Sequence, residues 1–426
     1  MRTVAALFAA GLLAGATSSM AQEAGETDVA AFQRLRAEGV AAANADDLVT
    51  AEARLAEADA RIPTHPGLML MRARLAAAAG RPAEALALAQ RYADTGLSMN
   101  LGGDPALAGL EDQPGFAALA AAVEANRRPV GADRLTPLAV VPGDGLVESL
   151  ARDEARGRWL VAMVRGRTIM TLDDAGGMGP FLGAVEETGG VLGLALDVGA
   201  GVLWAATAPL RPAMHGKAGD APASALLKID AASGRVLGRY PVPGEQMLGD
   251  VALAPDGTVY AAGGDLFQLK PGATALETLL PAGVMRSPQG MAVTPDGAAL
   301  VVADYSSGLW RVDRSSGAAE RMAAPSNASL IGVDGLIPHG GHLYALQNGT
   351  APQRVLRLTM DAGWSRIDGV ETLAANLPEI DEPTTGLVHY GELVFVSRSQ
   401  WSDFDGEGAL KSPEPAPALV SRLRLD

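Results

Sequence analysis

The chain has 426 residues, 48% of them hydrophobic and 19% charged, so it can bury a large core and does not have the composition of a disordered protein. Its formal net charge of −15 argues against binding to nucleic acid or docking on an anionic membrane, because both need a basic surface. The sequence contains no cysteine, which excludes disulfide bonds and lipid attachment at cysteine.

Residues 1–21 have the organisation of a secretory signal peptide. Arg2 precedes a short apolar run, and Ser19 and Ala21 are the small residues expected before a cleavage site. We expect cleavage after Ala21 and no membrane span in the mature chain, because no second long apolar run follows. An exported protein without disulfides indicates a periplasmic or secreted location.

Residues 22–127 are rich in alanine and repeat their apolar residues at intervals of three and four, which predicts α-helices. Pro63, Pro66, Gly80 and Pro82 separate the helical segments. Residues 79–96 resemble the second helix of a tetratricopeptide repeat, which implies a surface that binds a protein partner. A plain bundle of helical hairpins is the alternative.

After a linker around residues 127–131, the period of the sequence changes to two. Residues 131–426 contain six similar units, which begin near residues 147, 192, 248, 288, 333 and 384. Each unit has an apolar strand, a turn such as Pro-Asp-Gly, and a second apolar strand. This spacing predicts a six-bladed β-propeller, and so a mainly β protein with a small helical domain before it. A two-sheet sandwich lacks this longer period.

The two ends of a propeller must be joined. Residues 136–142 have the pattern of an outer strand, and residues 418–425 form the last apolar strand of the chain. We expect these two strands to pair and to close the ring.

The first strands of the six units line the central channel of a propeller, so their equivalent positions face one another. An alignment of the units places six residues in this ring: Glu148, Leu192, Gly249, Gln289, Asp334 and Thr385. Carboxylate, amide and hydroxyl oxygens that converge there are the ligands that Ca²⁺ prefers. Asp250, beside Gly249, would add a further oxygen. The sequence therefore predicts a cation or small-molecule site on the axis.

Four of these stretches resemble the senescence-marker protein/gluconolactonase (regucalcin-like) family of propellers. They are VESLARDEARGRWL, LGDVALAPDGTVYAAG, SPQGMAVTPDGAALVVAD and GVDGLIPHGGHLYAL. The resemblance implies a divalent metal held by Glu148, Gln289 and Asp334, with Asp334 as general base and Asp250 in substrate binding. Two residues depart from the family pattern, because Gln289 and Gly249 both stand where the family has asparagine.

The resemblance also implies an activity, the metal-assisted hydrolysis of a small lactone-like substrate bound in the mouth of the propeller. Fold does not by itself imply function. The alternative is therefore a non-catalytic periplasmic binding or scaffold protein that uses its helices and propeller to hold a ligand or another protein.

Polar residues at strand ends are further candidates for the substrate site. Gln347, Asn348 and Arg354 surround an Asn-Gly turn, and Arg398 follows a strand of the last unit. Turn formation is the alternative role for the first three. His339 and His342 flank a hairpin turn instead of sharing one helix face, so we do not expect them to bind zinc.

Overall fold

The computed structural model describes residues 26–183, 189–213 and 222–426, so the predicted signal peptide lies outside the described residues. The chain divides into two compact units. The first comprises the residues up to Arg127 together with Ser326–Ser329, and the second comprises the rest of the chain from Arg128.

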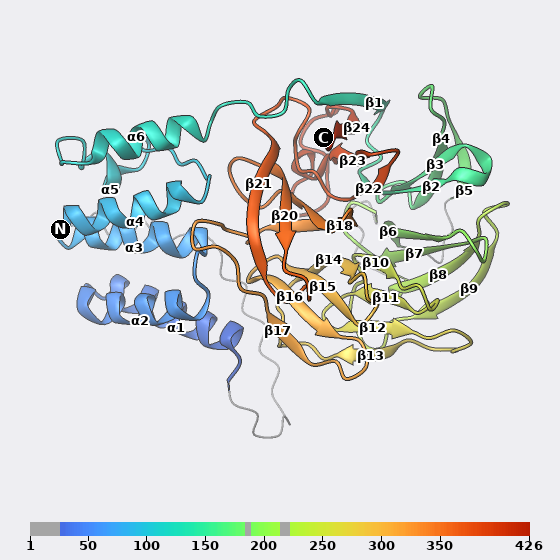
Figure 1. Ribbon diagram of the computed structural model, residues 1–426, viewed down its shortest axis with the longest axis horizontal. Helices are drawn as coiled ribbons and strands as arrows, with labels where there is room; N and C mark the ends of the chain where they lie inside the picture. Colours follow the sequence, from blue (N-terminus) through green and yellow to red (C-terminus); the bar gives the residue numbers. More distant parts are fainter. Residues whose placement is uncertain (1–25, 184–188, 214–221) are drawn as a thin grey trace. The chain divides into compact units, whose positions relative to one another are not determined.

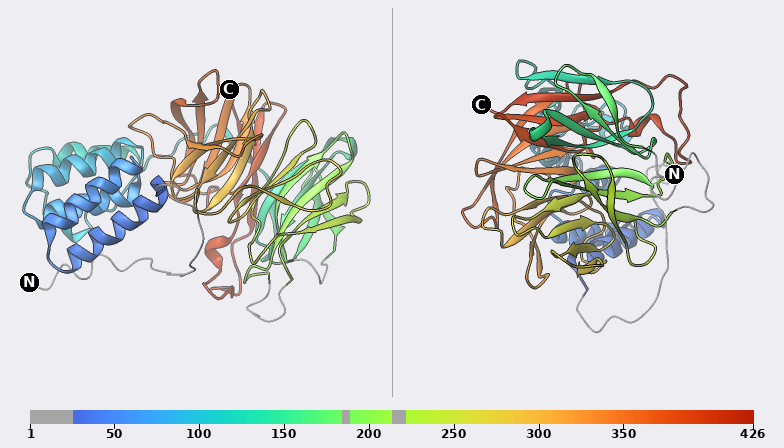
Figure 2. Two further views of the ribbon diagram at one scale, coloured as in Figure 1. Left: turned by 90° about the horizontal axis from the view of Figure 1, so that it is seen from below. Right: turned by 90° about the vertical axis from the view of Figure 1, so that its right-hand side faces the viewer.

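The first unit consists of helices that pack in pairs. Helix α1 packs against α2, and α3 packs against α4 (Figures 1 and 2). The described helices are α1 (Asp28–Asn44), α2 (Leu48–Arg61), α3 (Pro66–Ala78), α4 (Pro82–Asp94), α5 (Pro105–Ala108) and α6 (Phe116–Ala125). The backbone N–H groups in the first turns of α1 and α2 are capped by the side chains of Thr27 and Asp47, and Pro66 and Pro82 begin α3 and α4.

A buried carboxylate joins three of these helices. Asp59 of α2 accepts hydrogen bonds from Arg72 of α3 at 2.5 Å and from Arg91 of α4 at 2.6 Å. His65 caps α3 by accepting a hydrogen bond from the N–H of Leu68 at 3.3 Å, and burial lowers the pKa of His65 to about 4. The interior is otherwise built from small and apolar side chains.

The second unit is a six-bladed β-propeller, as the sequence predicts. It contains six sheets of four antiparallel strands each. Blade 1 is β2 (Val147–Asp153), β3 (Arg158–Met163), β4 (Thr168–Leu172) and β5 (Met178–Leu182); blade 2 is β6 (Gly190–Asp197), β7 (Val202–Ala208), β8 (Ala225–Asp230) and β9 (Val236–Pro241). Blade 3 is β10 (Val251–Leu253), β11 (Val259–Ala262), β12 (Leu266–Leu269) and β13 (Glu277–Leu280); blade 4 is β14 (Pro288–Val293), β15 (Ala299–Asp304), β16 (Gly308–Asp313) and β17 (Ala319–Arg321). Blade 5 is β18 (Val333–His339), β19 (His342–Gln347), β20 (Arg354–Met360) and β21 (Ile367–Ala375); blade 6 is β22 (Gly386–His389), β23 (Glu392–Arg398), β24 (Ala418–Arg424) and β1 (Leu135–Val141).

The sheets close into a ring. The first strand of each blade contacts the first strand of the next, and β22 returns to contact β2 (Figure 1). Apolar side chains fill the spaces between neighbouring blades, as in the cluster that joins Val394 and Val396 of blade 6 to Leu150 and Val161 of blade 1. Strand β1 pairs with β24, which confirms the predicted closure.

Two kinds of local contact hold the innermost strands of neighbouring blades together. In blades 2, 4 and 5 a glycine lets the next strand approach closely: a Cβ on Gly290 would lie 2.3 Å from the carbonyl oxygen of Asp334. In blades 1 and 3 a polar side chain accepts a hydrogen bond from the next strand instead. The Ser149 Oγ accepts from the N–H of Leu194 at 3.1 Å, and the Asp250 Oδ2 accepts from the N–H of Met291 at 3.3 Å.

Candidate functional site

The candidate site is built on irregularities at the starts of the innermost strands. In blades 1, 2, 4 and 5 the pairing register shifts there by a β-bulge, and the bulges contain Glu148, Leu192, Gln289 and Asp334. A bulge interrupts the alternation of side chains and re-aims one of them. All four side chains consequently line one cavity at this end of the channel.

This mouth cavity has a volume of about 730 Å³. Its described lining includes Glu148, Gln289, Tyr305, Asp334, Asn348 and Trp401. Below it the channel narrows to a small passage of about 20 Å³, which Glu148, Gln289 and Asp334 also line. The structure therefore brings together the three residues for which the family resemblance implies metal binding, in a cavity of the size that small molecules occupy.

Each of the two carboxylates in the mouth has a hydrogen-bond donor on one of its oxygens. Trp401 Nε1 donates to Glu148 Oε2 at 2.6 Å, and Asn348 Nδ2 donates to Asp334 Oδ2 at 2.7 Å. Asn348 is held in turn by the hydroxyl of Tyr305, which donates to its Oδ1 at 2.9 Å. These bonds fix both carboxylates and leave the other oxygen of each without a hydrogen-bond donor from the described side chains.

The acidic side chains in the channel have raised pKa values, because they are buried close to other negative charges. Burial, and then the charge of Asp334, raise the pKa of Glu148 well above its ordinary value. Burial raises the pKa of Asp334 to about 7, against the opposing effect of the Asn348 hydrogen bond, and the charges of Asp250 and Glu382 add to the rise. Because Arg286 is the single basic side chain in the described lining of the mouth cavity, the protein itself offsets little of this repulsion.

The glycine of blade 3 and the glutamine of blade 4 are complementary in the structure. The Oε1 of Gln289 lies 3.8 Å from the position that a Cβ on Gly249 would take, and its Nε2 donates to the Oγ of Ser287 at 3.0 Å. The longer side chain of Gln289 thus directs its carbonyl oxygen toward the space that Gly249 leaves open. Both departures from the family pattern are parts of one local arrangement.

The register of blade 6 differs from the sequence alignment by one residue. Gly386 and Leu336 each pair with the fourth residue of the following strand, β23 and β19 respectively. Thr384, two residues before Gly386, is therefore the equivalent of Asp334, and its hydroxyl donates to the carbonyl oxygen of Glu148 at 2.6 Å. Thr385, which the alignment selects, lines the narrow passage and the cavity at the opposite end of the channel.

Three of the predicted substrate-binding residues serve the fold. Gln347 and Arg354 are partners on β19 and β20, and Arg354 Nε donates to Gln347 Oε1 at 2.7 Å inside blade 5. Arg398 donates to the carbonyl oxygen of Pro378 at 2.6 Å. None of the three is in the described lining of the mouth cavity. These hydrogen bonds account for the polarity of the three side chains within the fold, and their part in substrate binding stays a prediction. Asn348, the third candidate around the Asn-Gly turn, does line the cavity.

Tyr305 and Glu382 are site residues that the sequence analysis missed. Tyr305 directly follows β15, whose last residue pairs with the first residue of β14, so it lies at the same end of blade 4 as Gln289. Burial raises the pKa of Tyr305 to about 12, which keeps its hydroxyl protonated as a donor. Burial also raises the pKa of Glu382, which accepts a hydrogen bond from the N–H of Ser402.

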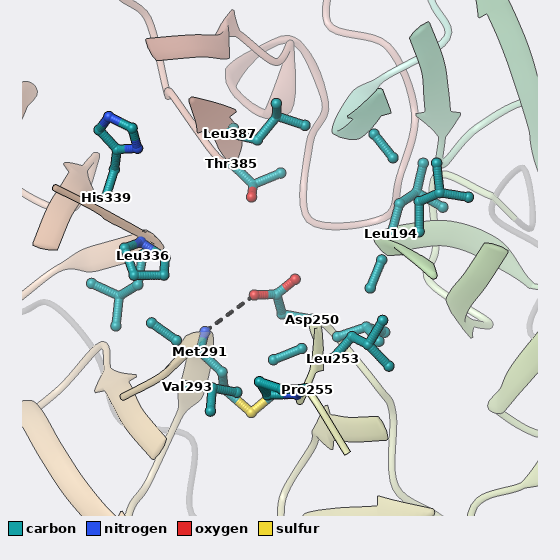
Figure 3. Close-up of a pocket in the computed structure, with 18 of the residues that line it drawn as sticks. Leu194, Asp250, Leu253, Pro255, Met291, Val293, Leu336, His339, Thr385 and Leu387 are labelled. Carbon is teal, nitrogen blue, oxygen red and sulfur yellow. Dashed lines mark hydrogen bonds between the residues drawn. The ribbon is translucent and has the colours of Figure 1, made fainter. Parts of the chain in front are cut away.

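Asp250 belongs to the other end of the channel. Its carboxylate lines the narrow passage and a second cavity below it, and is absent from the described lining of the mouth. Figure 3 shows Asp250 with its hydrogen bond to Met291 and with leucine side chains around it. Burial raises the pKa of Asp250 to about 6. Asp250 therefore lies toward the opposite end of the channel, and it shares only the narrow passage with Glu148, Gln289 and Asp334.

The donor set of the mouth agrees with a hard cation in chemistry, although not with an all-carboxylate site. Among the described residues, no three His, Cys, Asp or Glu side chains converge as metal ligands do. A cation in the mouth would use Glu148 and Asp334, the carbonyl oxygen of Gln289, and water. This mixture of carboxylate, amide and water oxygens is suited to Ca²⁺.

No protein-family model matches the sequence, and no curated protein matches it either. Solved structures that are similar include a gluconolactonase from Xanthomonas campestris, at 16% identity over 70% of this chain and 91% of that one, with a TM-score of 0.46. Regucalcin from Agrobacterium tumefaciens, a calcium-binding protein, has 17% identity over 69% and 92% of the two chains and a TM-score of 0.45. A luciferin-regenerating enzyme has 14% identity over 68% and 95%, and a TM-score of 0.47. Two of these three neighbours bear the names, gluconolactonase and regucalcin, of the family that the sequence stretches resemble.

No helix among the described residues combines the length and the apolar character that crossing a bilayer requires.

Proposed function

We propose that the mouth cavity holds a divalent cation, Ca²⁺ by its donor chemistry, between Glu148, Gln289 and Asp334, and that the protein hydrolyses a small cyclic ester there. The observation that carries the proposal is the pair of carboxylates, both with raised pKa, that share this cavity with an amide oxygen. A cation between them would relieve their repulsion, which the described protein groups leave largely uncompensated. When bound, it would polarise the ester carbonyl and stabilise the developing negative charge.

The chain itself supplies the proton transfers. Asn348 holds Oδ2 of Asp334, so the other oxygen is left to take a proton from the attacking water. The water oxygen then bonds to the carbonyl carbon, and the ring carbon–oxygen bond breaks. Asp334 returns its proton to the alkoxide that leaves, which completes the hydrolysis to a hydroxy acid.

The walls of the mouth favour a polar, uncharged substrate. Gln246 and Gln289 present amides, and Tyr305 and Trp401 present aromatic faces beside polar groups. The excess of carboxylates would repel an anionic substrate and would aid the release of the hydroxy acid product, which is an anion.

The experiment that tests this function is a calcium titration followed by thermal unfolding, with hydrolysis measured on a panel of five- and six-membered lactones. We expect Ca²⁺ to raise the melting temperature, because it binds only the folded state. Asp334→Asn should abolish this rise and should lower the rate of hydrolysis by about 10²–10⁴-fold, the usual contribution of a general base.

Glu277→Gln, which removes an exposed carboxylate from the outer strand β13, is the matched control and should change neither measurement. If Ca²⁺, Mg²⁺, Mn²⁺ and Zn²⁺ all leave the melting curve unmoved and no lactone is hydrolysed, the proposal is wrong. The protein would then be a binding or scaffold protein, with its helical unit as the surface for a protein partner.

We also propose export to the periplasm or the exterior, from the sequence of residues 1–21. N-terminal sequencing of the mature protein should give Gln22 as the first residue.

A further inference from the structure

The channel has a second cavity at the end opposite the mouth. This far cavity has a volume of about 710 Å³, and apolar side chains form most of its wall. They include Leu150, Leu194, Leu253, Val293, Leu336 and Leu387, which come from six different strands of the propeller and surround the channel. Figure 3 shows the carboxylate of Asp250 at the centre of this ring, with the hydroxyl of Thr385 facing it.

The charge of Asp250 is more than the fold requires. Asp250 accepts a hydrogen bond from the N–H of Met291 in the next blade. In blade 1 the equivalent residue, Ser149, makes the same type of bond to Leu194 with an uncharged hydroxyl. A serine therefore suffices to join two neighbouring strands at this position, and the ionised group of Asp250 needs another explanation.

The described lining of the far cavity offers Asp250 no cationic partner. The lining includes two basic residues, Arg152 and His339. The guanidinium of Arg152 is bound to Glu154 at 3.0 Å and to Asp174 at 2.9 Å, and His339 is exposed at the outer end of β18. The carboxylate thus faces an apolar space without a positive charge of the protein against it, which is the arrangement that an organic cation would complete.

We propose that the far cavity binds an organic monocation with an apolar body, whose ammonium group meets Asp250 and whose hydrocarbon part contacts the ring of leucines. This site is distinct from the mouth cavity and does not depend on the hydrolysis proposed above. A hydrated metal ion fits it poorly, because the leucine wall offers no oxygens to replace the water of the ion. An anion is excluded by Asp250 itself.

The proposal is tested by calorimetric titration of the intact protein at pH 8 with three eight-carbon probes that differ in their head group. We expect n-octylammonium to bind at one site, n-octanol to bind about tenfold more weakly or worse, and n-octanoate not to bind. Calcium at saturating concentration should leave the affinity for n-octylammonium within about twofold, because the mouth site is separate.

Three variants locate the site. Asp250→Ser keeps the hydrogen bond that Ser149 makes in blade 1 and removes the charge, so it should abolish the preference for octylammonium over octanol. Leu387→Gln, on the partly exposed wall, should weaken both probes. Asp334→Asn, in the mouth, should keep the preference for octylammonium over octanol, because Asp250 is intact, although the loss of a nearby negative charge lowers the affinity for octylammonium slightly.

Two results would overturn the proposal. One is that octylammonium does not bind, or binds no better than octanol, to the wild-type protein. The other is that Asp334→Asn removes the preference while Asp250→Ser keeps it, which would assign the cation to the mouth. Thermal melting of each variant shows whether it is folded, and Leu253→Gln provides a second wall variant if Leu387→Gln is not.

Discussion

The two ends of the propeller channel are built from the same six strands and yet have opposite characters. At the mouth, bulges turn Glu148, Gln289 and Asp334 toward the axis, and the lining is acidic and rich in hydrogen bonds. A few residues further along, the same strands present leucine and valine, and Asp250 is the single acidic residue in the described lining. The difference teaches that one irregularity at the start of a strand suffices to separate two chemical environments within a single channel.

The largest effect on stability is expected from adding a side-chain carbon at Gly290, where the innermost strands of blades 4 and 5 touch between the two ends of the channel. A Cβ on Gly290 would lie 2.3 Å from the backbone oxygen of Asp334 and 2.8 Å from the backbone nitrogen of Leu336, so the strands themselves would have to shift to admit it. We expect Gly290→Ala to lower the free energy of unfolding by about 3–5 kcal/mol, measured by denaturant titration. Gly406→Ala is the control, because a Cβ there has no neighbour within 4 Å. Equal stability of the two variants would show that the strands are not closely packed at this point.

The buried carboxylates of the mouth should make the stability of the protein depend on pH. Since burial raises the pKa of Asp334 to about 7, the folded protein holds a proton that the unfolded chain has released between about pH 4 and pH 7. Without calcium, stability should therefore fall as the pH rises through this range, and Asp334→Asn should reduce that fall. Denaturant titrations at pH 5 and pH 8 in a chelator measure it.

Comparing the wild-type protein with Asp334→Asn removes the contribution of titrating groups that do not interact with Asp334. His65 in the helical unit has a lowered pKa, so its ionisation acts in the opposite direction as the pH rises. That contribution is the same in the wild-type protein and in Asp334→Asn, and it cancels in their difference. Identical pH dependence in both would mean that Asp334 is ionised at an ordinary pH.

A smaller effect, on calcium affinity, is expected from replacing the two residues that depart from the family pattern. Gln289→Asn withdraws the carbonyl oxygen from the space beside Gly249 and should weaken calcium binding by about tenfold, which corresponds to about 1.4 kcal/mol. Gly249→Asn combined with Gln289→Asn should recover most of that affinity, because an amide oxygen is restored on blade 3. Calorimetric titration of the single and double variants measures the coupling. Strictly additive effects would contradict the complementarity of the two positions.

The smallest effect is expected from removing the helical unit. Every described residue that lines either cavity belongs to the propeller unit. A fragment that begins at Arg128 should therefore bind calcium and n-octylammonium within about twofold of the full chain. A larger loss of affinity for only one of the two ligands would show that the helices contribute to the end of the channel that binds it.

Much of this architecture follows from the sequence. The six units and the pairing of β1 with β24 are confirmed, because the repeat period and the alternation of apolar residues record the burial of each blade on both faces. The positions of Glu148, Gln289 and Asp334 follow as well, since each precedes a recognisable apolar strand. The register of blade 6 does not follow, because Gly386 comes after Thr385 just as Gly290 comes after Gln289 and Gly335 after Asp334. This likeness selects Thr385, whereas the strand pairing selects Thr384.

The residues that hydrogen-bond to the polar side chains of the site could not be predicted from the sequence, for a different reason. Tyr305 contacts Asn348, and Trp401 contacts Glu148, across distances of 43 and 253 residues in the chain. Such contacts depend on which strand ends meet once the ring is closed. For the same reason Gln347 and Arg354 looked like ligand groups, although the pairing of β19 with β20 directs them to each other.

The closure of the ring by β1 also has a consequence for how the protein is made. Leu135 pairs with Leu423, so the sixth blade cannot be completed until nearly the whole chain has been synthesised. A contact between such distant segments carries a large loop-closure entropy and slows folding. Once formed, the same contact opposes unfolding. The chain runs from β1, in the sheet of blade 6, directly into blade 1, so the two blades stay tethered until β1 detaches from β24. Detachment of this seven-residue strand, which fastens the ring from its N-terminal side, is therefore one of the steps by which the folded state can be lost.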